Sequence, residues 1–154
     1  LKLAASYYDG NYLLDENGVK EENAERNRLT FGGKYEGKSL VIRSEYITAK
    51  TGMGDRTPGE YYILNSDGFY VAAGYWFNYT CKKTGVQHKI RPVARYDFFR
   101  EDVTDINTNS TYYMVGIDWW PMQNLRLLVN YTLKDKVAND NFGHLFQAQL
   151  SVKF

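Results

Sequence analysis

The sequence lacks an uninterrupted apolar run of the ~18 residues that a transmembrane helix requires. Its single cysteine, Cys81, excludes an intrachain disulfide and a cysteine-rich metal site, and we expect an unpaired structural thiol there. Neither sign of charge dominates, because 19 Lys and Arg residues nearly balance 18 Asp and Glu residues. This balance gives no support for nucleic acid as a partner. The length of 154 residues suits one domain, so residues 1–154 are treated as a single segment.

Eight segments alternate apolar and polar residues with a period of two. This period is typical of β-strands, because successive side chains leave a strand on opposite faces. The segments span residues 1–8, 27–36, 39–49, 68–79, 88–100, 111–120, 124–134 and 144–154. A usual length of roughly nine to eleven residues is what a tilted strand needs to cross a bilayer.

The connections between these segments are sorted by length. Long polar stretches at 9–26, 50–67 and 101–110 alternate with short ones, of which Gly37-Lys38 and 121–123 are the tightest. Barrels of the outer membrane have short turns at one end and long loops at the other. The sequence therefore predicts an all-β fold, an antiparallel up-and-down transmembrane β-barrel. A last strand that must close against another strand in lipid stays regular to its final residue, as 144–154 does.

Aromatic residues are abundant, with 14 Tyr, 8 Phe and 3 Trp. Many of them lie near the ends of the predicted strands on the apolar face, where barrels carry girdles of aromatic rings at the membrane boundaries. The predicted girdle consists of Tyr7, Tyr35, Phe69, Phe77, Phe98, Tyr113, Trp119 and Phe154.

The opposite, polar face of the predicted strands carries most of their charges. Basic side chains in a pore attract anions, whereas paired charges only shape the wall. The predicted pore-lining residues are Arg43, Glu45, Arg91, Arg95, Asp97, Asp118 and Arg126.

The alternation also predicts register. A two-residue turn at Gly37-Lys38, of type II′, would place Lys34 opposite Val41. The shortest loop at 121–123 would place Asp118 directly opposite Arg126 as a wall-forming pair. Arg91 and Arg95 are then the unpaired cations expected to attract anions, with Arg91 stacked on Trp76.

No catalytic or metal-binding set emerges from the remaining residues. His88 and His144 fall at opposite ends of the predicted strands, so they cannot share a metal or a proton relay. Asp102, Asp105 and Asn107 lack the spacing and the glycine of a calcium loop, and we expect solvated loop side chains. We predict neither enzymatic activity nor a cofactor.

Four stretches carry a resemblance to a known family: GFYVAAGYWF, IRPVARYDFFRED, TYYMVGIDWWPMQNLRLLVNYTLKD and LFQAQLSVKF. They resemble the C-terminal part of the phosphate-selective porin O and P family over residues 67–154. The resemblance implies a trimeric channel of about sixteen strands in the bacterial outer membrane, of which eight strands are half. It also implies that the barrel-assembly machinery recognises the terminal Phe154, that N-terminal strands complete the barrel, and that small solutes, including anions such as phosphate, diffuse passively through it.

Two other readings fit the same alternation. One is a complete eight-stranded membrane barrel with a structural or adhesive role, although its interior would be poorly filled by Ala4, Ser6 and Gly116. The other is a soluble lipocalin-like barrel, with the apolar face turned inward around a ligand.

Overall fold

The fold is one curved antiparallel β-sheet. The computed structural model describes residues 1–16, 19–54, 61–137 and 139–153, with side chains left out at 12–16, 19–24, 54, 61 and 139–142. Its strands are β1 (Lys2–Glu16), β2 (Val19–Glu36), β3 (Leu40–Gly54), β4 (Tyr61–Tyr75), β5 (Phe77–Thr80), β6 (Gln87–Arg100), β7 (Asn109–Met122), β8 (Leu125–Lys136) and β9 (Asn139–Val152). A short 3-10 helix, η1 (Ile106–Thr108), precedes β7. In the described part of the chain, no helix is long and apolar enough to span a bilayer.

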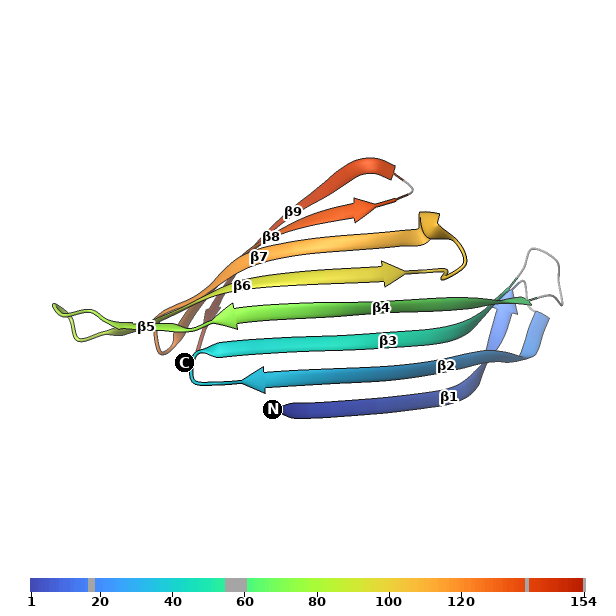
Figure 1. The fold of residues 1–154 in the computed structure, drawn as a ribbon, viewed down its shortest axis with the longest axis horizontal. Coiled ribbons are helices and arrows are strands. Elements are labelled where there is room, and N and C mark those ends of the chain that lie inside the picture. The colour runs from blue at the N-terminus through green and yellow to red at the C-terminus, as the bar shows by residue number, and fades with distance from the viewer. Residues whose placement is uncertain (17–18, 55–60, 138, 154) are drawn as a thin grey trace.

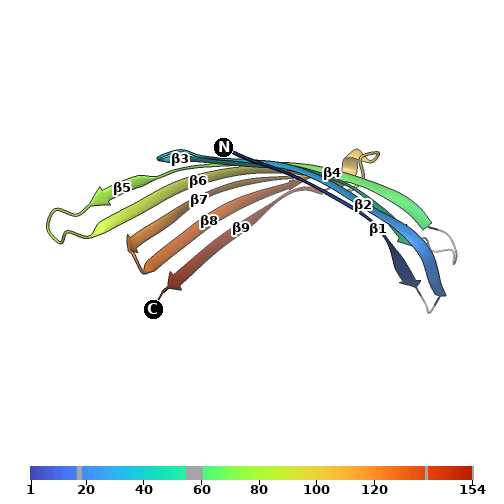
Figure 2. The same cartoon turned by 90° about the horizontal axis from the view of Figure 1, so that it is seen from below.

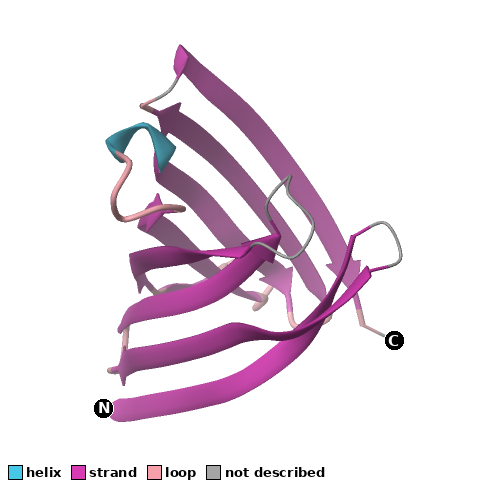
Figure 3. Ribbon diagram, turned by 90° about the vertical axis from the view of Figure 1, so that its right-hand side faces the viewer, coloured by secondary structure: helices cyan, strands magenta, loops and turns pink. Residues whose placement is uncertain are grey.

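Each strand pairs with its neighbours along the chain, in the order β1-β2-β3-β4-β6-β7-β8-β9, with β5 beside β6 (Figure 1). β4 and β5 act as one strand interrupted at Trp76, because their register against β6 does not change across it: Gly74 faces Val93 and Phe77 faces Ile90. The eight predicted strands and their up-and-down order are therefore confirmed. β1 and β9 are the edges of the described sheet, which stays open (Figure 3).

The strands are longer than the alternation predicts. The predicted loops 9–26 and 50–67 are strand over residues 9–16, 19–26, 50–54 and 61–67. These extensions are held by backbone pairing, as between Asn11 and Glu25, rather than by an apolar face. The prediction of long loops there was wrong, because a strand segment without an apolar face needs no alternation.

The turn between β2 and β3 differs from the predicted one. Glu36 faces Val41 and Lys34 faces Arg43, so the register lies two residues from the prediction. Gly37 N–H donates to the Leu40 carbonyl at 2.9 Å, and among described glycines only Gly85 has a positive φ, of 68°. A type II′ turn needs that conformation at its first central residue. In this longer turn, the Ser39 carbonyl accepts a hydrogen bond from the Trp76 N–H at 2.8 Å. This bond ties the turn to the end of β4.

Successive strands are staggered along the sheet. Leu29, in the middle of β2, shares a row of paired residues with Thr48, Asp67 and Arg100, and this row ends at Asn109, the first residue of β7. Such a stagger tilts strands in a barrel. We call the end with the connections 37–39, 81–86 and 123–124 the turn end, and the end with residues 101–108 the loop end (Figure 1).

The two faces of the sheet differ in both chemistry and exposure. Along β7, Tyr113, Val115, Ile117 and Trp119 are exposed, whereas the side chains between them are partly or fully buried. The sheet is strongly curved (Figure 2), and side chains crowd on the concave side of a curved sheet and diverge on the convex side. The polar side chains therefore occupy the concave face.

Candidate functional site

All seven predicted pore-lining residues lie on one face, which we call the polar face. The cross-strand register fixes this, because paired residues point to the same side. Arg43 and Arg95 both pair with Ala72, and in the next row Glu45 and Asp97 both pair with Tyr70. The remaining members, Arg91, Asp118 and Arg126, follow the same parity on β6, β7 and β8.

Asp118 forms the centre of a charged cluster and is fully buried. Arg91, directly opposite on β6, places Nη2 at 2.6 Å from its Oδ2. Arg126 donates from Nε to Oδ1 at 2.7 Å and from Nη2 to Oδ2 at 3.0 Å. The predicted pair exists, but the predicted register was wrong. Asp118 faces Leu128, and the irregularity between Trp119 and Met122 shifts the pairing, so Arg126 reaches Asp118 diagonally.

Both arginines of this cluster stack on indole rings. The guanidinium of Arg91 lies 4.5 Å from the ring centre of Trp76, which confirms the predicted stack. The guanidinium of Arg126 lies 4.9 Å from that of Trp120. The two indoles are themselves 5.0 Å apart at an angle of 48°. We call Trp76 and Trp120 the tryptophan platform.

A second ion pair lies on one strand. Arg95 donates from Nε to Oδ1 of Asp97 at 2.9 Å, and its guanidinium lies 4.2 Å from the ring centre of Tyr70. The expectation that Arg91 and Arg95 are unpaired was therefore wrong, because alternation gives the face of a side chain but not which neighbour it reaches.

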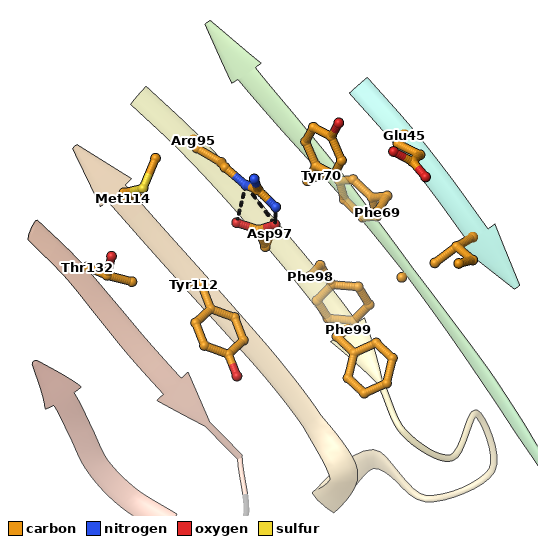
Figure 4. A pocket seen from close by; sticks show the side chains of 12 residues that line it. Glu45, Phe69, Tyr70, Arg95, Asp97, Phe98, Phe99, Tyr112, Met114 and Thr132 are labelled. Atoms are coloured by element: carbon orange, nitrogen blue, oxygen red, sulfur yellow. Dashed lines mark hydrogen bonds and ion pairs between the residues drawn. The ribbon is translucent and has the colours of Figure 1, made fainter. Parts of the chain in front are cut away.

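Next to this pair the polar face is hollowed. The hollow, of about 460 Å³, is lined by Glu45, Tyr70, Arg95, Asp97 and Tyr112 together with the apolar side chains of Phe99 and Met114 (Figure 4). Its charged side chains are two acids, Glu45 and Asp97, and one base, Arg95, so the hollow carries no excess of positive charge.

The cations that do gather on the polar face lie elsewhere. Lys2 faces Lys34, and Lys34 faces Arg43, so three basic residues stand side by side on β1, β2 and β3. Lys34 bonds Glu36 at 2.5 Å, and a hollow of about 350 Å³ that reaches Glu45 is lined by all three. We call these three residues the basic row. The two-residue error in register hid the row, although its members share the polar parity in the sequence.

The predicted girdle residues other than Phe154, which lies outside the described residues, are on the apolar face. Ring contacts join Phe69 to Phe98 at 5.8 Å and Tyr96 to Tyr113 at 5.3 Å, across β4, β6 and β7. Tyr7 and Phe69 depart from the prediction that these residues lie near strand ends, because β1 runs on to Glu16 and β4 already begins at Tyr61.

Beyond these rings, towards the loop end, the apolar face becomes polar. Arg100 donates to Asp67 from Nε at 2.6 Å and from Nη2 at 2.5 Å, and Tyr46 Oη donates to Asp67 at 3.3 Å. This ion pair is the next pair on the same face beyond Phe69 and Phe98. The apolar band thus ends at this row.

The histidines and loop acids form no site. His144 Nδ1 lies 2.7 Å from Tyr131 Oη, and His88 stacks on Tyr79 at 6.2 Å. Asp102 Oδ1 accepts from the N–H of Thr104, whose donors hold the pKa of Asp102 below its ordinary value. In the described part of the chain, no group of three or more His, Cys, Asp or Glu residues could hold a metal ion.

The comparison with protein families decides the identity. The sequence profile of the phosphate-selective porin O and P family matches residues 39–154. The chain belongs to this family. Phosphate-selective porins O and P are channel proteins of the bacterial outer membrane, which places this chain there, and its sheet is part of the antiparallel barrel of such a porin. The family is not one of enzymes. Neither curated proteins nor solved structures gave a match.

Proposed function

We propose that this protein is a passive diffusion channel whose polar face lines a water-filled lumen, and that small hydrophilic anions, phosphate among them, cross it. The observation that carries the proposal is the division of the sheet into two faces. Every charge of the predicted pore lining is on the concave face, while the convex face is apolar between its aromatic rings. Charged side chains cannot face lipid without a large cost, whereas water or a solute satisfies them.

The preference for anions is assigned to the basic row. Like charges placed directly across strands repel each other, so a passing anion relieves their repulsion. Lys2, Lys34 and Arg43 have this arrangement, with Glu36 and Glu45 as the nearby acids. By contrast, Arg91, Arg95 and Arg126 are each held in an ion pair with an aspartate, and Arg91 and Arg126 share Asp118. These three are assigned to holding the wall in shape.

The family supplies further parts of the proposal. The turn end is assigned to the periplasm, since short turns lie on that side in outer-membrane barrels. The exposed aromatic residues of the apolar face are assigned to the membrane boundaries. A homotrimer, completion of the barrel by N-terminal strands, and recognition of the last strand by the barrel-assembly machinery are proposed on family grounds.

The test is ion conduction by the full protein in a planar lipid bilayer under a KCl gradient. Step-like conductance with a reversal potential on the anion side is expected. Arg43→Gln should lower the ratio of anion to cation permeability by roughly two- to fivefold, since one charge at close range in water is worth about 1 kcal/mol. Arg95→Gln is the matched control, because its charge is paired with Asp97.

Two results would count against the proposal. A protein that inserts but never conducts is not a diffusion channel. If Arg43→Gln and Arg95→Gln shift the reversal potential equally, the basic row has no special role.

A further inference from the structure

We propose that the tryptophan platform, together with Lys38 and Lys89, binds a phosphorylated sugar at the turn end of the polar face. The inference rests on the proposed function in that it requires this face to be open to solutes. The inference adds ligands that contain a sugar ring, whereas the basic row offers only positive charge to a passing solute.

The site is a hollow of about 520 Å³ separate from the basic row. This volume lies within the range of about 300–1,000 Å³ typical of small-molecule sites. The lining consists of the two indoles, two lysines, three amide side chains and one thioether: Trp76, Trp120, Lys38, Lys89, Asn78, Gln87, Gln123 and Met122.

The platform is held in place by the cluster around Asp118. Asp118, fully buried, fixes the guanidiniums of Arg91 and Arg126, and each guanidinium stacks on one indole. The backbone N–H of Trp76 is also bonded to the Ser39 carbonyl at 2.8 Å. A rigid ring surface costs little entropy when a ligand is laid on it. The cluster therefore pre-organises the indole faces.

The chemistry of the lining selects the ligand. The faces of indoles carry negative π density, which attracts the C–H face of a sugar ring. The amides of Asn78, Gln87 and Gln123 can both donate to and accept from hydroxyl groups. Lysine ammonium groups bind phosphate as point charges. Within the described part of the chain, neither Lys38 nor Lys89 takes part in an ion pair. Ring surface, hydroxyl partners and free positive charge thus meet in one hollow.

Tryptophan fluorescence of the full protein in detergent micelles tests the site directly. Titration with glucose 6-phosphate should change the emission in a saturable way. Its affinity should exceed those of glucose and of inorganic phosphate by at least about tenfold, because each of these offers only one half of the contacts. The readout needs no conduction, so it stands whether or not the protein passes ions.

Adjacent tryptophans provide a matched pair of variants. Trp120→Leu should weaken glucose 6-phosphate binding by about tenfold, whereas Trp119→Leu, one residue away on the apolar face, should leave it unchanged. Lys89→Gln, at an exposed side chain, should weaken glucose 6-phosphate but not glucose, and it replaces Trp120→Leu if that variant does not fold.

Three results would overturn the proposal. They are equal affinity for glucose 6-phosphate and inorganic phosphate, equal losses in the Trp119 and Trp120 variants, and a Lys89→Gln protein that binds as the wild type does.

Discussion

Arg126 binds Asp118 without facing it across the sheet. Its Nε lies 2.7 Å from Oδ1 of Asp118, while the residue opposite Asp118 is Leu128. On the other side of β7, Arg91 of β6 does face Asp118 directly and also binds it. One buried carboxylate therefore binds two guanidiniums, one on β6 and one on β8. Three strands are thereby tied together on the polar face.

Asp118→Asn should destabilise the protein strongly. The amide keeps the shape but leaves two guanidiniums without a counter-charge, and breaking a buried ion pair costs about 3–5 kcal/mol. We expect the lower end, about 3 kcal/mol, since the side chains of Arg91 and Arg126 keep exposed fractions of 21% and 37%. The measurement is urea unfolding in detergent micelles, followed by circular dichroism.

Asp97→Asn is the control for this prediction. Asp97 is partly exposed and pairs with Arg95 on its own strand, so its loss should cost at most about 1 kcal/mol. Equal losses in the two variants would show that the Asp118 cluster does not tie the strands together.

Gly116→Ala should also destabilise the sheet. A Cβ at residue 116 would overlap Oδ1 of Asn130 and lie 2.8 Å from the Val129 carbonyl oxygen on β8. Overpacking of this kind costs about 1–3 kcal/mol. Gly32→Ala, on the same face, meets no atom closer than 3.4 Å and should change the free energy of unfolding by less than about 0.5 kcal/mol. If urea unfolding shows no difference between the two variants, the close approach of β7 and β8 is not as described.

The loop that follows β6 should loosen in acid. Asp102 Oδ1 accepts from both N–H and Oγ1–H of Thr104, at 2.8 Å and 2.7 Å, and these bonds lower the pKa of Asp102. A lowered pKa means that the ordering is complete above the ordinary Asp pKa, near 4, and is lost as the pH falls through the lowered value. Hydrogen exchange of the 101–108 segment should therefore lose protection below that point.

Thr104→Val provides the internal check on the acid response. Without the hydroxyl donor, the pKa of Asp102 should rise towards its ordinary value, so protection should be lost at a higher pH. Thr111→Val, on β7, should not shift the midpoint. An unchanged midpoint in Thr104→Val would mean that Asp102 does not control this loop.

The alternation predicted the core of the fold because lipid on one side and water on the other impose it. From Leu29 to Leu150, the residues that the alternation places on the apolar face do share one face in the observed strand pairing. The same reasoning missed the strand extensions, since residues such as Glu25 and Arg26 pair through their backbones and form no apolar face. Only a segment that presents one apolar face leaves a period of two in the sequence.

Register and side-chain partners were beyond reach for a different reason. The 37–39 turn is bonded through the Ser39 carbonyl to the Trp76 N–H, a contact between residues far apart in the chain that alternation cannot reveal. The partner of Arg95 is set by the reach of its side chain along β6. A shift of two residues preserves each face, so faces were predicted correctly while the basic row was not.

The most direct experiment determines which face of β7 is in contact with water when the protein is in a membrane. Met114→Cys and Val115→Cys, each in a Cys81→Ser background, place a thiol on the polar face and on the apolar face respectively. In proteoliposomes, a water-soluble maleimide that does not cross lipid should label residue 114 rapidly and leave residue 115 unlabelled. Faster labelling of residue 115, or equal labelling of both, would contradict a polar face that lines the lumen and an apolar face that meets lipid.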